Sequence, residues 1–562
     1  MQLSTPIDAG RLVAYAVWYA FYLIEFLVLA VLVRRAFSRR SRVPMFPRAF
    51  ETLARQRTRA VVVTGLTALV ARALLLPVLP VRQPVITDEF SYLLAADTFA
   101  SGRLTNPTHP MWGHFESMHT MQHPTYAAMH HPAQGLILAA GKVMFGHPWA
   151  GVCVSVALMC ALLTWMLQGW LPPAWALLGG LLGVLRLGLY GYWVNSYWGG
   201  AAAAIGGLLV LGAMPRLLRG VRTRDAVLLA VGLVILAHSR PYEGLLVAAP
   251  VCVYLAVGLG RRRAIARAAI PAGLVLALAA AGTCYYYWRV TGNPLRMPYQ
   301  EARDQYATAR IFLWEKPNPA PHYPFEAMRA FYLDWELVKF LEAKTLPGLV
   351  HNTIGKTGAF WMFFLGPALA LPLLFGWRLI LDRRVRPLLV TGGICAAGFA
   401  VNTWFYAHYA APMTGLIYAL VLQGMRHLRA RRAAGAAVAR AVVWTCVGMA
   451  ALRACAQPLS FYMPPDWPMT WYYTRPGNVQ RARVLRELES MPGPQLAIVR
   501  YRPGHNFFEE WVYNAASIDA AKVVWAHEMG SDADAGLLRY FSGRQVWLVD
   551  ADARPAQLTK LR

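Results

Sequence analysis

Two adjacent carboxylates, Asp88 and Glu89, lie in a polar interval between two apolar segments of the chain. A carboxylate in such a position can accept a proton from a substrate hydroxyl, which is the chemistry of a general base. The same interval, residues 84–135, contains six histidines: His109, His114, His119, His123, His130 and His131. A solvated loop whose charges merely keep it out of an apolar phase would have a similar composition. The interval alone therefore leaves both interpretations open.

The histidines also raise the hypothesis of a metal site. Their spacing matches no established zinc pattern, since there is no HExxH motif and His130 and His131 are adjacent rather than one helical turn apart. Asp88 and Glu89 could still hold a divalent cation, which is the alternative. The pattern therefore favours a protein that uses neither a metal nor a cofactor.

Three short turns between apolar segments add candidates for binding a substrate. They contain Asn195 and Tyr197, Arg240 and Glu243, and His408 and Tyr409. Arg240 could bind a phosphate through two parallel hydrogen bonds. The alternative is an ion pair between Arg240 and Glu243 that only closes the turn. Tyrosine at a membrane boundary is commonly an interface anchor, which is the alternative for Tyr197.

The composition indicates which elements must position these residues. The 562 residues are 57% hydrophobic and 15% charged, with a mean hydropathy of +0.37, whereas soluble domains are usually about 25% charged. The chain is therefore predicted to be an integral membrane protein. Its net charge of +27 would suit nucleic acid as a partner, but the arginines cluster in short stretches between apolar segments. We predict membrane lipids, and no nucleic acid, among its partners.

A helix that crosses a membrane needs about 20 mostly apolar residues. The candidate spans are residues 12–33, 60–82, 149–170, 174–191, 200–215, 225–237, 243–260, 269–288, 357–377, 387–404, 412–425 and 438–456. The predicted fold class is a polytopic α-helical membrane protein of about twelve spans, with juxtamembrane helices in the first outer loop and a small C-terminal α/β domain.

Arginine-rich loops indicate on which side of the membrane each connection lies, because short cytoplasmic loops are enriched in arginine and lysine. Five such loops, residues 34–59, 216–224, 261–267, 378–386 and 426–440, alternate with the candidate spans and fall on one side. The interval 84–148, the segment 289–356 and the three polar turns then lie on the other side. We predict a bacterial inner membrane protein with both termini and the candidate residues on the periplasmic side.

Two outer segments are long enough to contain structure of their own. Residues 134–145 are too short to span a membrane and are predicted to form an amphipathic helix in its interface. The polar and aromatic segment 289–356 is predicted to contain helices around 325–343.

The residues after Pro464 and Pro465 have the composition of a small soluble domain. Apolar runs at 495–501, 522–526 and 545–550 alternate with helical patterns at 478–490, 507–515 and 532–542, which is typical of an α/β unit with a parallel sheet. The cluster Glu509-Glu510-Trp511 could contact a substrate, but it is interpreted as a solvated helix face. The predicted division of the chain is 1–59 for an extra span and a basic cytoplasmic loop, 60–456 for the membrane module and 457–562 for the periplasmic domain.

Two candidate spans carry an ionisable residue at their middle, Glu25 in the first and Arg72 in the second. A buried pair that neutralises both charges is the simplest account. We therefore predict that Glu25 and Arg72 are partners.

The layout resembles the GT-C superfamily of membrane glycosyltransferases, which includes protein O-mannosyltransferases and lipid A aminoarabinose transferases. Asp88-Glu89 followed by FSYLLAADTFASGRL is similar to the family's acidic motif and its helix. Met129–Gly135 is similar to the proline–glycine stretch before the second juxtamembrane helix, and His408–Pro412 to the late aromatic–proline motif. The resemblance covers residues 60–425, so an extra span precedes it and the C-terminal domain lies outside it.

The resemblance implies an enzyme that moves a sugar from a polyprenyl-phosphate donor to a lipid, glycan or protein acceptor on the outer face of the membrane. Asp88 and Glu89 would be catalytic, with Asp88 preferred as the base because it occupies the first acidic position of the motif and helical spacing points the two side chains in different directions. The residues expected to bind the donor phosphate or another part of the substrates are Arg240, Glu243, His130, His131, Asn195, Tyr197, His408 and Tyr409. The second outer loop has no DxD motif, which favours the metal-independent members.

The alternative function is a transporter or flippase of a lipid-linked anion. Transporters usually place their polar residues near the bilayer midplane, on interrupted helices within repeated halves. This chain concentrates its polar residues at one end of the predicted bundle and has no evident internal repeat. The pattern therefore favours the enzyme.

Overall fold

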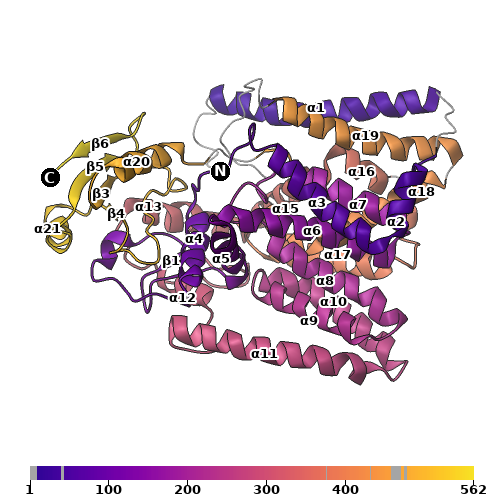
Figure 1. The fold of residues 1–562 in the computed structure, drawn as a ribbon, viewed down its shortest axis with the longest axis horizontal. Helices are drawn as coiled ribbons and strands as arrows, with labels where there is room; N and C mark the ends of the chain where they lie inside the picture. Colours follow the sequence, from indigo (N-terminus) through magenta and orange to yellow (C-terminus); the bar gives the residue numbers. More distant parts are fainter. Residues whose placement is uncertain (1–8, 39–43, 375, 431, 457–469, 474–476) are drawn as a thin grey trace.

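The computed structural model describes residues 9–562 except 39–43, 375, 431, 457–469 and 474–476. Long helices form a bundle, a layer of short helices and loops covers one end of it, and a small β-sheet lies beyond that layer (Figure 1). The candidate residues are carried by the covering layer and by the helix ends beneath it. The arrangement agrees with the prediction that polar residues gather at one end.

Each candidate span overlaps a helix of the bundle, although the span predicted at 60–82 ends in the structure at Leu74 and the one predicted at 357–377 begins at Leu346. The helices are α1 (Ala9–Ser38), α3 (Arg57–Leu74), α6 (Pro148–Trp170), α7 (Pro173–Leu187), α8 (Ala201–Arg219), α9 (Thr223–Ala237), α10 (Pro241–Gly260), α11 (Ile265–Thr291), α15 (Leu346–Phe360) joined through η3 (Trp361–Leu365) to α16 (Gly366–Leu374), α17 (Arg386–Val401), α18 (Thr414–Arg429) and α19 (Arg432–Ala456), with α2 (Arg48–Arg55) and η4 (Trp377–Leu379) in connections. Among the described residues, six helical stretches are long and apolar enough to cross a membrane: α6, α8, α10, α11, the run from α15 through α16, and most of α19. The chain is thus a multi-pass membrane protein, and the count of about twelve spans stays a prediction.

The covering layer is built from the two long outer segments and the last polar turn. Its elements are α4 (Thr87–Ala100), η1 (Trp112–Phe115), β1 (Thr120–Met121), β2 (Ala127–Ala128), α5 (Pro132–Phe145), α12 (Pro298–Tyr306), α13 (Glu326–Arg329), η2 (Ala330–Leu337), α14 (Val338–Ala343), η5 (Ala407–Tyr409) and η6 (Ala411–Met413). The helix predicted at 134–145 is α5, and those predicted around 325–343 are α13, η2 and α14, so both predictions of helix are confirmed.

Glycines set the close contacts that position the site. A Cβ at Gly135 would lie 2.6 Å from the Cβ of Ala95, so α4 and α5 pack at a distance that no larger residue allows. A Cβ at Gly207 on α8 would lie 2.0 Å from the carbonyl oxygen of Pro412. The turn that carries His408 is therefore seated directly on the backbone of α8.

The C-terminal residues form a four-stranded sheet with the order β4-β3-β5-β6. Its elements are α20 (Val479–Ser490), β3 (Gln495–Arg500), β4 (Val523–His527), α21 (Ser531–Tyr540), β5 (Gln545–Asp550) and β6 (Gln557–Lys560). The predicted parallel sheet is confirmed, because β3 pairs in parallel with both β4 and β5. The antiparallel strand β6 was not predicted. The predicted boundary at residue 457 and the Pro464-Pro465 pair lie outside the described residues.

One predicted helix of this domain is wrong. Residues 507–515 form a loop, because the carboxylate of Glu510 accepts the backbone N–H groups of Trp511 and Val512. Glu510 and Trp511 are buried, so the interpretation of this cluster as a solvated helix face is also wrong. The backbone N–H of Glu510 donates to the carbonyl of Val85 at 3.1 Å. The loop therefore ties the C-terminal domain to the segment that leads into α4.

The predicted pairing of Glu25 with Arg72 is wrong as well. Glu25 on α1 forms a buried ion pair with Arg186 on α7, whose two terminal nitrogens both reach the carboxylate. The guanidinium of Arg186 also lies 4.3 Å from the ring centroid of Trp471. Arg72 instead donates to Oδ1 of Asn195 at 2.8 Å. Helix packing decides the partner, because α1 and α7 both pack on α19, whereas α3 packs on α6 and α7.

The orientation in the membrane is testable by cysteine labelling. Thr52 is exposed on α2 in an arginine-rich loop, and Ser531 is exposed at the start of α21. In a background without the native cysteines, Ser531→Cys should react with an impermeant thiol reagent in intact spheroplasts, whereas Thr52→Cys should react only after permeabilisation. The reason is that arginine-rich loops stay in the cytoplasm. Labelling of Thr52→Cys alone in intact spheroplasts would invert the orientation.

Candidate active site

Asp88 lies in the first turn of α4 and faces two imidazoles. Its Oδ2 is 3.4 Å from Nδ1 of His119, and its Oδ1 is 3.3 Å from Nε2 of His130. The first turn of a helix suits a carboxylate, because the free N–H groups there carry partial positive charge. The side chain of Asp88 is 26% exposed, which leaves it open to a substrate.

The surroundings of Asp88 keep its carboxylate ionised. Burial raises the pKa of this carboxyl, but His119 and His130 lower it by more, so its pKa lies well below the ordinary value. Burial lowers the pKa of His119 to about 4, so this imidazole is neutral near pH 7. Asp88 is thus an ionised carboxylate held by ring nitrogens, and ionisation is the state in which a base can take a proton.

His119 is a site residue that was not predicted, since only His130 and His131 were singled out among the six histidines of the loop. Its backbone adopts the left-handed conformation, with φ at 67°, which non-glycine residues rarely adopt unless the surroundings hold them there. Its carbonyl accepts hydrogen bonds from Oγ of Ser91 at 2.7 Å and from the N–H of Met129 at 3.2 Å. Its Nδ1 lies 2.7 Å from Oγ1 of Thr87. No local spacing relates His119 to Asp88, because the loop and the β1–β2 hairpin bring it back to α4.

Glu89 faces away from this group, which confirms that the two acidic side chains point in different directions. It is buried, and its two oxygens accept the N–H groups of Val85 at 3.0 Å and Tyr197 at 3.1 Å. Burial raises the pKa of Glu89 to about 7. The geometry indicates that Glu89 ties the start of α4 to the turn at 188–200.

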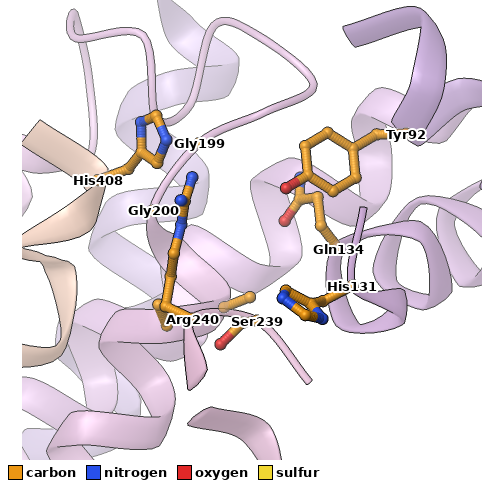
Figure 2. Close-up of a pocket in the computed structure, with 10 residues that line it drawn as sticks. Tyr92, His131, Gln134, Gly199, Gly200, Ser239, Arg240 and His408 are labelled. Carbon is orange, nitrogen blue, oxygen red and sulfur yellow. The ribbon is translucent and has the colours of Figure 1, made fainter. Parts of the chain in front are cut away.

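A pocket opens next to this group, between α4, α5, α8 and the turn before α10 (Figure 2). It is lined by Tyr92, His131, Gln134, Gly199, Gly200, Ala202, Ala203, Ser239, Arg240 and His408. In Figure 2 the side chain of Arg240 extends toward His408, and Tyr92 and Gln134 lie on the opposite side. Tyr92 follows Asp88 on α4 and His131 follows His130, so the pocket and the carboxylate are neighbours.

Arg240 supplies the fixed positive charge of the pocket lining. Its guanidinium lies 4.1 Å from the ring centroid of Tyr409. In the described part of the chain no carboxylate oxygen lies within 4.0 Å of it, so the alternative of an ion pair with Glu243 is not formed. Burial lowers the pKa of His131 to about 3 and holds the pKa of His408 well below its usual value. With neutral imidazoles around it, Arg240 is the lining group best suited to bind an anion.

The structure brings some of the predicted residues to the pocket and places others behind it. Those at or next to the pocket are Asp88, His130, His131, Arg240, His408 and Tyr409. Asn195 and Tyr197 are buried in the turn at 188–200, where Asn195 donates to two carbonyl groups of its own turn. Glu243 is buried in the first turn of α10 and is not among the lining residues. Tyr92, Gln134 and Ser239 line the pocket without having been predicted.

The remaining histidines of the first loop have other neighbours. His109 and His114 lie 3.0 Å and 3.3 Å from carboxylate oxygens of Asp519 and Asp534 in the C-terminal domain. Over the ranges that the structure describes, no group of three or more His, Cys, Asp or Glu side chains is arranged to hold a metal ion. That this protein functions without a metal stays a prediction.

No family model matches the sequence, and no curated protein matches it. Three solved structures illustrate what the chain is similar to. The oligosaccharyltransferase of Archaeoglobus fulgidus in complex with zinc and sulfate is 12% identical, with a TM-score of 0.47 over 79% of this chain and 60% of that one. The same archaeal enzyme, AglB, with an inhibitory peptide and a dolichol-phosphate is 13% identical, with a TM-score of 0.44 over 79% and 62%. ArnT from Cupriavidus metallidurans bound to undecaprenyl phosphate is 13% identical, with a TM-score of 0.45 over 87% and 92%.

The chain spans about 60% of the length of the archaeal oligosaccharyltransferase. The sequence resemblance to membrane glycosyltransferases is accompanied by structural similarity to an oligosaccharyltransferase and to ArnT over most of this chain. At identities of 12–13% and TM-scores below 0.5, these similarities do not identify the reaction.

Proposed function

We propose that this chain is a glycosyltransferase of the bacterial inner membrane that moves a sugar from a polyprenyl-phosphate donor to an acceptor on the periplasmic face. The observation that carries the proposal is the position of Asp88, an ionised and partly exposed carboxylate, beside a pocket whose cation, Arg240, has no carboxylate oxygen within 4.0 Å among the described residues. One group can take a proton and the other can bind a phosphate. The sequence resemblance supports the same reaction.

The reaction assigns one step to each of these groups. The acceptor hydroxyl attacks the anomeric carbon of the donor sugar, and its proton passes to the carboxylate of Asp88. The bond between the anomeric carbon and the phosphate oxygen breaks, and its electron pair leaves with the polyprenyl phosphate. Arg240 stabilises the negative charge on that leaving group. Since a hydroxyl is a poor nucleophile until it loses its proton, the proton moves to Asp88 as the sugar–phosphate bond breaks.

Binding of the donor phosphate is the part that Arg240 should control. Arg240→Ala is expected to weaken binding of undecaprenyl phosphate by about 10- to 100-fold, because hydrogen bonds to a charged group contribute about 1.5–3 kcal/mol. Arg240→Lys should bind with intermediate strength, since lysine keeps the charge but cannot form the bidentate hydrogen bonds of arginine. The measurement is titration of the purified protein with undecaprenyl phosphate, followed by native mass spectrometry.

Arg289→Ala is the matched control, because Arg289 is an exposed arginine at the end of α11. Its affinity should equal that of the wild type. Equal affinity of Arg240→Ala and the wild type would remove Arg240 from the donor site.

The transporter alternative makes a different prediction about the product. An enzyme of this kind releases free polyprenyl phosphate from the sugar-linked donor, whereas a flippase moves the intact lipid across the membrane. Purified protein is incubated in detergent with undecaprenyl-phosphate-linked sugars and a membrane extract as acceptor. Release of undecaprenyl phosphate is expected, and its absence together with flipping in vesicles would favour the transporter.

A further inference from the structure

Two arginines on the other side of Glu89 have side-chain nitrogens without partners. The side chain of Arg72 is 1% exposed, and its Nε and Nη1 are buried without a hydrogen-bond partner in the described residues. Its third nitrogen, Nη2, donates to Asn195. Arg82 also has a buried Nε without a partner there. No carboxylate oxygen of the described chain lies within 4.0 Å of either guanidinium.

Such an arrangement is costly unless something compensates it. A buried charge without a counter-charge is strongly unfavourable, which is why buried arginines are normally paired. Arg72 has partial compensation from the ring of Trp149, at 4.8 Å. Arg82 lies within electrostatic range of both Arg72 and Arg453, so the neighbouring charges add to the cost. The cluster therefore presents N–H donors and positive charge with no acid opposite them in the described residues.

The cluster lies close to the candidate active site but apart from the Arg240 pocket. The hydroxyl of Tyr197 donates to the carbonyl of Arg82 at 3.4 Å, and the N–H of Tyr197 donates to Glu89 at 3.1 Å. Tyr197 thus connects Arg82 to Glu89, the residue next to Asp88. Arg72 lies at the end of α3 and Arg82 in the segment that follows, and neither is among the residues that line the Arg240 pocket. The two arginine sites approach the acidic pair from different elements.

We propose that Arg72 and Arg82 bind the phosphate group of a second membrane lipid. Guanidinium N–H groups match phosphate oxygens in geometry and charge. A lipid is the source that we assign because Arg72 lies at the end of a bundle helix and the partly exposed Arg82 follows it, which is the level at which lipid headgroups lie. The assignment of this lipid as the sugar acceptor rests on the proposed function. The binding of the lipid to Arg72 and Arg82 does not.

The test counts bound phosphate lipids. Purified protein is titrated with phosphatidic acid, and with diacylglycerol of the same chains as the phosphate-free reference, and the retained lipids are counted by native mass spectrometry. The wild type should retain two more molecules of phosphatidic acid than of diacylglycerol. One is expected at Arg240 and the other at Arg72 and Arg82. Arg82→Gln should retain one, with the lost site weakened by about tenfold or more. The variant Arg82→Gln is preferred to Arg72→Gln because Arg82 is partly exposed and less embedded in the fold.

Two further variants separate this inference from the proposed function. Arg289→Gln, an exposed control, should retain two lipids. If Arg240→Ala still retains two while Arg82→Gln retains one, the donor site is wrong and this inference stands. If Arg82→Gln retains two, the inference is overturned whatever Arg240→Ala does. If inorganic phosphate binds the Arg82-dependent site as tightly as phosphatidic acid does, the assignment to a lipid is overturned.

Discussion

Replacement of Asp88 by asparagine is expected to lower the rate of sugar transfer by about 10²- to 10⁴-fold, the usual contribution of a general base. The change removes the charge that His119 and His130 face. Because asparagine has nearly the same shape as aspartate, folding and binding of undecaprenyl phosphate should be almost unchanged. The measurement is release of undecaprenyl phosphate from a sugar-linked donor by the purified variant, together with its affinity for undecaprenyl phosphate.

Asp97→Asn is the matched control on the same helix. Asp97 pairs with Lys142 and accepts a hydrogen bond from Tyr513, and it does not face the pocket lining. Its loss should leave transfer near the wild-type rate. Wild-type transfer by Asp88→Asn would eliminate Asp88 as the base. If Glu89→Gln is inactive while Asp88→Asn is active, the loop is correct and the residue is wrong.

The second large effect is expected at the ion pair between Glu25 and Arg186. Glu25→Gln leaves the guanidinium of Arg186 buried without its counter-charge, a loss of about 3–5 kcal/mol for a broken buried pair. The yield of monodisperse protein after detergent extraction should fall accordingly. Replacing both residues, Glu25→Leu with Arg186→Met, should recover most of the yield, because apolar pairs of similar volume often replace buried ion pairs without loss.

The double variant Glu25→Leu with Arg72→Met is the matched control for this pair. It removes an arginine that does not contact Glu25, so it should not recover the yield. Recovery by the Arg72 variant, and not by the Arg186 variant, would contradict the pairing that the structure shows.

The sequence predicted the bundle well because membrane helices are defined by a local property. Each predicted span is a run of apolar residues, and each of the twelve runs overlaps a helix, although the helix ends differ. Helix and strand patterns in the C-terminal domain are also local, and β3, β4, β5, α20 and α21 lie where they were predicted. The helix predicted at 507–515 failed because Glu510 binds backbone N–H groups of the next two residues, and this side-chain contact competes with a helix.

The candidate site was predicted in part for the same reason. Asp88, Arg240 and His408 stand out because polar residues at the ends of apolar segments are unusual. His119 was not distinguished, because its approach to Asp88 depends on the path of the loop and on a left-handed backbone at that residue. Tyr92 and Gln134 were not singled out either, because helices bury many such side chains and only their packing shows that these two line a pocket.

By itself, the sequence determined that this is a membrane protein, which segments form its apolar helices, and that its polar residues gather between them. These properties follow from the composition of each segment. The tertiary structure decided which residues are partners: Arg186 rather than Arg72 for Glu25, 161 positions apart in the chain, and His119 with His130 for Asp88. The physical reason is that a partner is set by which helices pack together and by how loops return to them, and neither is encoded in the period or hydropathy of a single segment.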